Sequence, residues 1–242
     1  MWLFYTDRMN ETLLELKNIS KRYGKQQALT DVSFAIKKGH IYGFVGENGA
    51  GKTTTLRIIT GLSKQTSGTV EYSLNGNKKP GCMIEGPVFD GFLNAAENLK
   101  LHAMLYGVKD FSNIPQVLER TGLGNVGNKK VRNFSMGMKQ RLGIAAAMIS
   151  NPELLILDEP VNGLDPLGMI AVRKLLSSLN KDDGITILLS SHILSELQEL
   201  ATDYIFISGG KILNCVSAAD VLAGGQSLEQ YYLGLFSEGQ NE

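Results

Sequence analysis

The first third of the chain contains short stretches in which apolar and polar residues alternate. Residues 13–19 and 29–36 both follow this period of two, which predicts strands with one buried face. Residues 69–74 lead into Asn75 and Gly76, a pair typical of tight hairpin turns. We therefore expect an antiparallel hairpin there, before a short strand at residues 81–84. The early part of the chain is predicted to form mixed β structure.

The period changes to a helical one between residues 93 and 122, where apolar positions recur three and four residues apart. These positions define two apolar faces. The first comprises Leu101, Met104, Leu105 and Val108, and the second comprises Ile114, Val117, Leu118 and Thr121. Because a third helix is expected to run through residues 142–149, we predict a small helical subdomain at about residues 86–150.

Strands and helices alternate in the remainder of the chain. The predicted elements are a buried strand at residues 154–157, a helix at 167–179, a strand at 185–189, a helix at 193–200, a hairpin of strands 204–207 and 211–216, and a helix at 227–236. Asp165 and Pro166 are suited to the N-cap and the first turn of the helix at 167–179. Alternation of this kind is typical of an α/β fold with a mainly parallel sheet.

Composition is that of a folded α/β domain. With 242 residues, 43% of them hydrophobic, the chain can bury a substantial core, either as one large domain or as one domain with a subdomain. The 24 basic and 24 acidic residues cancel, so we expect no nucleic-acid partner. Cys82 and Cys215 lie far apart in the sequence, which suits free thiols in the reducing cytosol.

No apolar stretch approaches the roughly 18 residues that a membrane-spanning helix needs. Residues 1–5 are apolar but lack the basic start of a signal peptide, and Asp7 follows closely. Met9 is a suitable alternative start. We therefore treat residues 1–8 as an extension that is either non-native or disordered, and residues 9–242 as the functional domain.

A glycine-rich loop stands between a predicted strand at residues 41–45 and a predicted helix at residues 53–59. Its spacing fits the phosphate-binding pattern G-x-x-x-x-G-K-[ST], in which glycines let backbone N–H groups surround an anion at a helix N-terminus. Lys52 would contact the β- and γ-phosphates, and the Thr53 hydroxyl is suited to Mg²⁺. The predicted binding loop comprises Gly46, Glu47, Asn48, Gly49, Ala50, Gly51, Lys52, Thr53 and Thr54. A glycine-rich turn without a ligand is the alternative.

Two adjacent carboxylates, Asp158 and Glu159, follow the buried strand at residues 154–157. Open α/β sheets place their ligands at this end of the strands. Asp158 is therefore a candidate ligand for Mg²⁺, and Glu159 a candidate base that polarises an attacking water. The alternative for this pair is a solvated loop.

From about residue 13 to its end, the chain resembles the ATP-binding subunit of an ABC transporter. The loop from Gly46 to Thr53 resembles the Walker A loop, and the strand with Asp158 and Glu159 resembles Walker B. Tyr23 matches the aromatic residue that stacks on adenine, and His192 matches the switch histidine that contacts the γ-phosphate. The D-loop, which reaches across the dimer in the family, corresponds to Asn162, Gly163, Leu164 and Asp165. His40 and His102 match no family position and are expected to be surface or packing residues.

The chain departs from the family pattern at two motifs. Its signature reads Phe134, Ser135, Met136, Gly137 and Met138, so the Ser135 hydroxyl and the Gly137 N–H that grip the nucleotide of the opposite subunit remain. Glu85 stands where most cassettes carry the Q-loop glutamine, and a carboxylate there can approach Mg²⁺ or its waters. Both departures resemble the subgroup that serves bacitracin-resistance and lantibiotic-immunity exporters.

The resemblance implies a P-loop NTPase cassette with a mixed β-subdomain and a small helical subdomain. It also implies an ATPase that uses ATP and Mg²⁺, forms a dimer with a second cassette, which is expected to be an identical copy, and drives a separate membrane-spanning subunit from the cytoplasmic face. The expected cargo is an antimicrobial peptide or a related amphiphile. Two alternatives stay open: a soluble cassette ATPase that is not coupled to transport, and a cassette that binds ATP without hydrolysing it.

Overall fold

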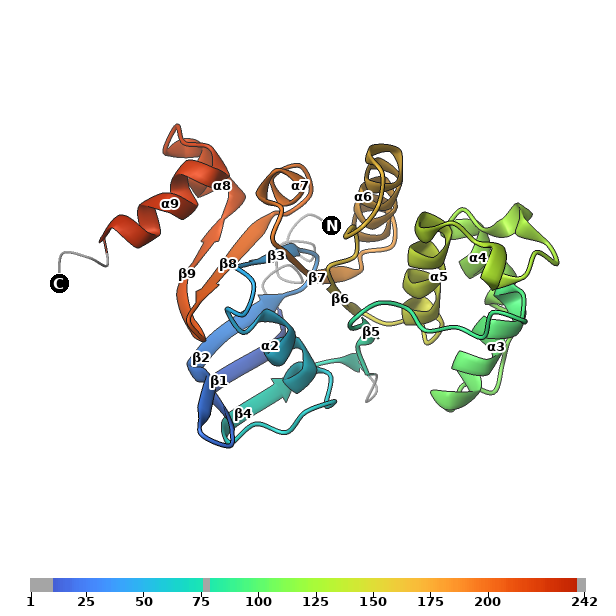
Figure 1. The fold of residues 1–242 in the computed structure, drawn as a ribbon, viewed down its shortest axis with the longest axis horizontal. Helices are drawn as coiled ribbons and strands as arrows, with labels where there is room; N and C mark the ends of the chain where they lie inside the picture. Colours follow the sequence, from blue (N-terminus) through green and yellow to red (C-terminus); the bar gives the residue numbers. More distant parts are fainter. Residues whose placement is uncertain (1–10, 76–78, 239–242) are drawn as a thin grey trace, which may run out of the picture.

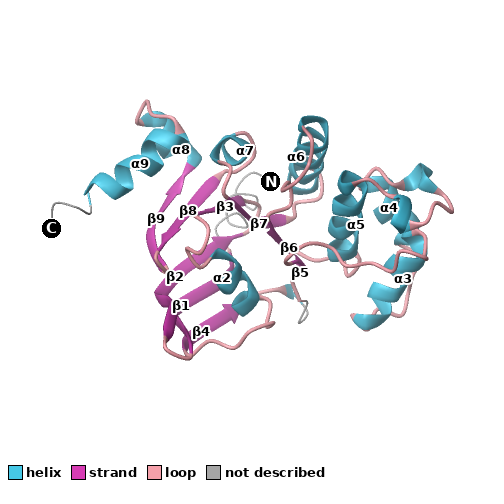
Figure 2. Ribbon diagram, in the orientation of Figure 1, coloured by secondary structure: helices cyan, strands magenta, loops and turns pink. Residues whose placement is uncertain are grey.

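The computed structural model describes residues 11–75 and 79–238, so the extension at residues 1–8 lies outside the described part. Two β-sheets form one side of the molecule, and a group of helices forms the other (Figures 1 and 2). The smaller sheet is antiparallel, with the order β2-β1-β4, and comprises β1 (Thr12–Tyr23), β2 (Gln26–Lys37) and β4 (Ser67–Tyr72).

The larger sheet has the order β5-β6-β7-β3-β8-β9. Its members are β3 (Ile41–Val45), β5 (Gly81–Met83), β6 (Leu154–Asp158), β7 (Thr186–Ser191), β8 (Asp203–Ser208) and β9 (Lys211–Ser217). All neighbouring strands pair in parallel except β8 and β9, which form the predicted antiparallel hairpin. The prediction of a mainly parallel sheet is confirmed.

One short helix, α2 (Lys52–Ile59), lies against both sheets. Its residues Leu56, Ile58 and Ile59 are buried in a cluster that also contains side chains of β1 and β2 and of the strands β3, β6, β7 and β8. The opposite face of the larger sheet is covered by helices. These are α6 (Pro166–Lys181), α7 (Leu194–Gln198), α8 (Ala218–Ala223) and α9 (Leu228–Glu238).

The remaining helices, α3 (Ala95–Leu105), α4 (Ile114–Arg120) and α5 (Met136–Met148), lie together beyond the β5 edge of the larger sheet (Figure 1). Their buried side chains continue the core under the sheet. The predicted face of α4 is confirmed, because Ile114, Val117, Leu118 and Thr121 are all buried.

The apolar face predicted for α3 is wrong. Leu101, Met104 and Leu105 are 44%, 55% and 76% exposed, whereas Ala95, Leu99 and Ala103 face the core. The start of α3 sets this orientation. Asn94 and Glu97 form a capping box, and the buried Asn98 amide donates to the carbonyls of Asp90 and Asn94, 3.0 Å away in each case. The helix therefore packs through Leu99 and through small and polar side chains, and it exposes Leu101, Met104 and Leu105.

The hairpin predicted around Asn75 and Gly76 is also wrong. The strand before the turn, β4, pairs with β1, where Leu16 is opposite Val70, while β5 pairs with β6 in the other sheet. Gly76 itself lies outside the described residues. Hence the turn connects two sheets and not two paired strands.

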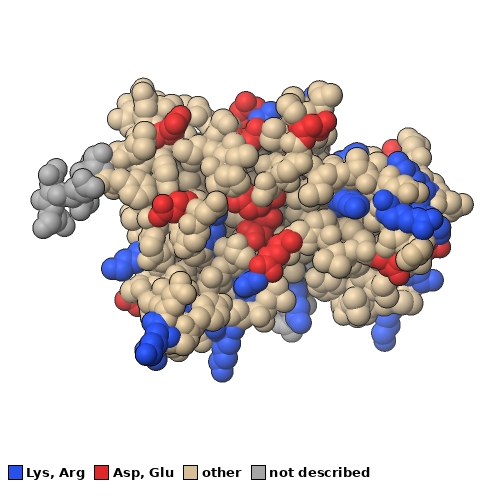
Figure 3. Space-filling view, in the orientation of Figure 1, with Lys and Arg blue, Asp and Glu red and all other residues tan. Residues whose placement is uncertain are grey.

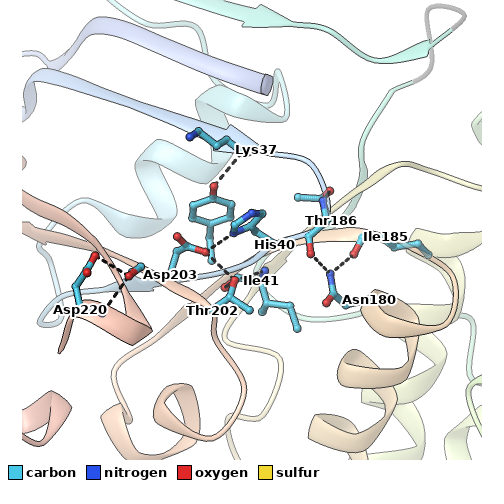
Figure 4. Close-up of polar contacts among 12 residues, drawn as sticks. Lys37, His40, Ile41, Asn180, Ile185, Thr186, Thr202, Asp203 and Asp220 are labelled. Carbon is cyan, nitrogen blue, oxygen red and sulfur yellow. Dashed lines mark hydrogen bonds and ion pairs between the residues drawn. The ribbon is translucent and has the colours of Figure 1, made fainter. Parts of the chain in front are cut away.

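A group of polar side chains joins the starts of β3, β7 and β8, at the end of the larger sheet opposite to the glycine-rich loop (Figure 4). His40 Nδ1 lies 2.6 Å from Asp203 Oδ2, and Thr202 Oγ1 donates to the same oxygen at 2.7 Å. Asn180 donates to the Ile185 carbonyl at 2.9 Å. His40 is thus a packing residue, as its sequence position predicts.

Candidate nucleotide-binding and catalytic site

The glycine-rich loop connects the buried strand β3 to the start of α2, as predicted. Gly51 caps α2 with a φ of 109° and offers no side-chain hydrogen bond, so the first N–H groups of the helix are left for a ligand. Gly46 is needed for a different reason. A Cβ at this position would lie 2.4 Å from the Ile207 carbonyl oxygen on β8, so the loop could not approach that strand. The backbone therefore forms an anion-binding turn at a helix N-terminus.

Lys52 is buried inside this loop, and its ammonium donates to the carbonyls of Gly46 and Glu47. Burial lowers the pKa of Lys52, while Glu159, Asp158 and Glu47 act in the opposite direction. A phosphate placed beside this amine would favour its charged form and relieve the cost of burying it.

Three oxygen-bearing side chains are held together beside the loop. Thr53 Oγ1 donates to Asp158 Oδ2 at 3.0 Å, and Ser190 Oγ donates to Asp158 Oδ1 at 2.6 Å. The same Ser190 hydroxyl accepts from the backbone N–H of Glu159 at 2.9 Å. Asp158 and Ser190 are directly opposite each other on the parallel strands β6 and β7. Ser190 therefore orients both carboxylate residues, a role that no sequence motif indicated.

Glu159 and His192 form the second polar pair of the site. Glu159 Oε2 lies 2.9 Å from His192 Nδ1, and the two side chains come from the loops that follow β6 and β7. Glu159 has a positive φ of 49°, and its carbonyl accepts from the Gln140 amide of α5 at 3.4 Å. The pair thus has the arrangement of a general base and the group that orients it.

A cavity of about 700 Å³ connects these features, within the usual size range of small-ligand sites. Of the predicted residues, its wall contains Tyr23, Glu47, Asn48, Gly49, Gly51, Lys52, Thr53, Thr54, Glu159 and His192. Gly46 and Ala50 belong to the same loop but not to this wall, and Asp158 at the end of β6 accepts a hydrogen bond from Thr53, which is in the wall. Tyr23 stands at the end of β1, 45% exposed, and the Lys21 ammonium lies 4.7 Å from the centre of its ring.

The wall also contains residues that the motifs did not indicate, namely Gln26, Gln27, Ala28, Gly209 and Gly210, together with Asn162 of the predicted D-loop. The turn between β8 and β9 supports the loop directly, because the Gly210 N–H donates to the Ala50 carbonyl at 3.0 Å and its carbonyl accepts from the Thr30 N–H at 2.8 Å. A Cβ at Gly210 would lie 2.4 Å from the Ala28 carbonyl oxygen. The sequence predicted only a hairpin of strands 204–207 and 211–216 in this region, because contacts of this kind join distant segments.

Three predicted residues lie around a different cavity. Ser135 caps α5 by accepting from the Met138 N–H at 3.2 Å, and Asp165 caps α6 by accepting from the Gly168 N–H at 2.8 Å. Together with Gly137 they line a cavity of about 440 Å³ between the starts of these helices. They are not in the wall of the first cavity, which agrees with action on the nucleotide of another subunit.

Glu85 is the one predicted ligand that the structure places away from both cavities. Its carboxylate forms an ion pair with the Arg57 guanidinium at the end of α2, and its side chain is 55% exposed. The hydrogen bond from Arg57 holds the pKa of Glu85 below its usual range. The expected approach of Glu85 to Mg²⁺ is thus not seen in this conformation.

Comparison with known proteins accounts for this arrangement. The ABC transporter family model matches residues 29–162. The chain belongs to the ABC transporter ATP-binding family. Over 206 residues it is 45% identical to a protein of Streptococcus pyogenes named lantibiotic transport ATP-binding protein SrtF, covering 83% of this chain and 89% of that protein. Over 210 residues it is 46% identical to the bacitracin transport ATP-binding protein BcrA of Bacillus licheniformis, covering 84% of this chain and 69% of that protein.

Solved structures lead to the same family. An ATP-binding subunit of an ABC transporter is 31% identical, has a TM-score of 0.79, and the match covers 93% of this chain and 100% of that one. A dimeric cassette bound to ADP and Pi in a post-hydrolysis state is 26% identical with a TM-score of 0.74, over 85% of this chain and 99% of that one. The cassettes of this family bind and hydrolyse ATP, and their ATP-binding subunits pair with membrane subunits. Within the described residues of this cassette, no helix has the length and apolar character to cross a membrane.

Proposed function

We propose that this cassette is the Mg²⁺-dependent ATPase of a peptide exporter, acting on the cytoplasmic face of a separate membrane-spanning subunit. The observation that carries the proposal is the cavity in which the phosphate loop and the Glu159–His192 pair face each other. It would bring the γ-phosphate of ATP and a base for the attacking water into one site.

In hydrolysis, the water oxygen forms a bond to the γ-phosphorus while the bond from that phosphorus to the β–γ bridging oxygen breaks, leaving ADP and phosphate. Glu159 accepts the proton of the water, and His192 holds its carboxylate in position from 2.9 Å away. Lys52 offsets the negative charge of the phosphates. No redox partner or covalent intermediate is required.

The donor set beside the loop fits Mg²⁺, which prefers oxygen ligands and usually retains waters or phosphate oxygens in its shell. The Thr53 hydroxyl and the Asp158 carboxylate, 3.0 Å apart, would hold it. Acidic side chains gather near the middle of the face shown in Figure 3, over the central strands, so an added polyphosphate needs a cation beyond Lys52. When bound, Mg²⁺ would supply that charge to the phosphate oxygens.

A second copy of the cassette would complete each site. Ser135 at the N-terminus of α5 and the loop before α6, which line a cavity separate from the phosphate loop, would contact the nucleotide bound by the other copy. Dimeric cassettes among the related solved structures support this expectation.

The docking site for the membrane subunit is proposed to be the groove beside the segment that follows β5. This groove, of about 240 Å³, has more apolar than polar lining and includes Ile84, Pro87, Val88, Phe89 and Tyr106. The large side chains that α3 exposes, such as Leu101 and Leu105, stand on the adjacent helix. An exposed group of large apolar side chains of this kind is typical of a protein interface.

The proposed cargo is an antimicrobial peptide or a related amphiphile. Support comes from the names of SrtF and BcrA, which refer to lantibiotic and bacitracin transport. The departures at the signature motif and at Glu85, which resemble the bacitracin-resistance and lantibiotic-immunity subgroup, point in the same direction.

The test of the ATPase assignment is Glu159→Gln. This variant should bind ATP as the unchanged protein does, but loss of a general base should slow hydrolysis by about 10²- to 10⁴-fold. The ATP-bound dimer should accumulate and be visible by size-exclusion chromatography with Mg²⁺. Glu229→Gln on the surface of α9 is the matched control and should turn over normally. Undiminished turnover in Glu159→Gln would remove Glu159 from the mechanism.

The test of the transport assignment uses the groove. Val88 is 85% exposed, so Val88→Asp should leave folding and the ATPase activity of the isolated subunit intact while abolishing co-purification with the membrane subunit and resistance in cells. Leu222→Asp is the control, because Leu222 is 62% exposed on α8 and away from the groove. Normal assembly in Val88→Asp cells would refute the docking site. If the unchanged cassette purifies with no membrane protein, a soluble ATPase is favoured.

A further inference from the structure

The segment Met83 to Phe89 contains a sharp turn with unusual backbone angles. Glu85 has a φ of 61° and Gly86 has a φ of 88°, so two consecutive residues adopt the left-handed conformation. Space around Gly86 is open, so its glycine is explained by the backbone angle and not by crowding. At Glu85, however, a residue with a Cβ adopts a conformation that L-amino acids disfavour, and other interactions have to hold it there.

The interaction that the structure provides is the ion pair between Glu85 and Arg57. It joins two segments 28 residues apart in the sequence and is the first cause that holds the pKa of Glu85 low and that of Arg57 high. The Arg57 side chain is 38% exposed and that of Glu85 is 55% exposed. An exposed pair of this kind shifts an equilibrium by only a few-fold. Because the turn at Glu85 is itself disfavoured, a shift of this size is sufficient to change which conformation of the turn predominates.

The two ends of this ion pair belong to different functional regions. Arg57 stands in the last turn of α2, the eight-residue helix whose first residue is Lys52 of the phosphate loop. Glu85 is followed directly by Gly86, Pro87 and Val88, which all lie in the wall of the apolar groove. Helix α2 therefore connects the phosphate loop at its start to Arg57 at its end, and Arg57 holds the segment that contains Glu85.

We propose that Arg57 is a positioning residue, which fixes the Glu85–Gly86 turn and so links α2 to the conformation of the apolar groove. In the paired state, Glu85 is held outside the nucleotide cavity. If α2 moved, or if Glu85 left Arg57 to approach bound phosphates, the ion pair would break and the segment of residues 83–89 could change its conformation. The proposed effect on a membrane subunit rests on the proposed function, whereas the effect on the turn does not.

The first experiment measures hydrogen exchange in the full isolated chain without nucleotide, so that it needs neither ATPase activity nor a membrane partner. Arg57→Gln should raise the exchange rates of amides between residues 83 and 89 by about two- to five-fold. Arg57→Lys should keep most of the protection, because the charge remains. Arg120→Gln is the matched control, since it breaks the similarly exposed pair with Asp183 on another surface and should not alter this segment.

A double-mutant cycle separates pairing from a general structural effect. Glu85→Gln should raise the same exchange rates as Arg57→Gln does, and the double variant should add nothing further. The charge-reversed protein with Arg57→Glu and Glu85→Arg should recover protection relative to either single reversal. Unchanged exchange in Arg57→Gln, or strictly additive effects of the two neutral substitutions, would overturn the proposal.

The second experiment tests whether the Arg57–Glu85 pair links the cassette to the membrane subunit. Arg57 also faces the phenol of Tyr23, so ATP affinity has to be measured in the same variants. We expect Arg57→Gln to retain the ATP turnover of the isolated subunit within about two-fold, while resistance in cells with the membrane subunit changes. If the exchange results hold and resistance is normal, the link to a partner is wrong. A failure of Val88→Asp to affect assembly would instead refute the docking site and leave the exchange results unaffected.

Discussion

Ser190 offers a quantitative test of how the site is held together. It is fully buried on β7, and its hydroxyl donates to Asp158 Oδ1 at 2.6 Å while accepting from the Glu159 N–H at 2.9 Å. Ser190→Ala removes a hydrogen bond to a buried carboxylate, worth about 1.5–3 kcal/mol, and leaves a backbone N–H without this acceptor, at a cost of about 1–3 kcal/mol. The two terms share one site and are not additive, so we expect a loss of about 2–4 kcal/mol.

For a domain of this size, such a loss lowers the melting temperature by about 5–15 °C, which calorimetry or circular dichroism would measure. Displacement of Glu159 should also slow ATP hydrolysis by about 10- to 100-fold. Ser191→Ala is the control, because Ser191 is equally buried on the same strand but accepts only from the Ile193 N–H, at 3.0 Å, in the described contacts. It should cost about 1 kcal/mol and leave turnover within a few-fold. Wild-type stability and turnover in Ser190→Ala would refute the bridging role.

Three further predictions concern the nucleotide. Tyr23→Ala should weaken the binding of ATP and of GTP alike, by about 5- to 150-fold, since a stacked base contributes about 1–3 kcal/mol whichever purine it is. An unchanged dissociation constant would show that Tyr23 is an ordinary surface residue. Because burial lowers the pKa of Lys52 and a bound phosphate would raise it, ATP binding at alkaline pH should take up a proton, which calorimetry in buffers of different ionisation enthalpy would detect. Glu85→Gln should keep most of the ATPase activity of the isolated subunit but alter resistance, and normal resistance in Glu85→Ala cells at equal expression would argue against a coupling role.

Local sequence signals predicted most helices and strands of this fold correctly. The errors concern contacts between segments that are far apart in the sequence. Asp165 caps α6 because its short acceptor side chain and the following proline favour a helix start in any context. The pairing of β4 was not predictable in this way, because it depends on a strand far away in the sequence. β4 pairs with β1 and not with the strand that follows it. The α3 error has a third cause. Periodicity locates apolar residues such as Leu105, but it does not show whether the domain's own core or another protein covers them.

By itself, the sequence predicted the phosphate loop and the two carboxylates after β6, because glycine spacing and strand–loop–helix order restrict the backbone locally. The histidine after β7 was indicated by the resemblance to ABC cassettes. Only the tertiary structure decided what holds these groups in place. The Ser190 bridge, the support of Ala50 by Gly210 and the pairing of Glu85 with Arg57 each join segments well apart in the sequence. Such contacts involve common residue types in no fixed spacing, so they arise from the packing of the sheet and helices and are invisible until the chain is folded.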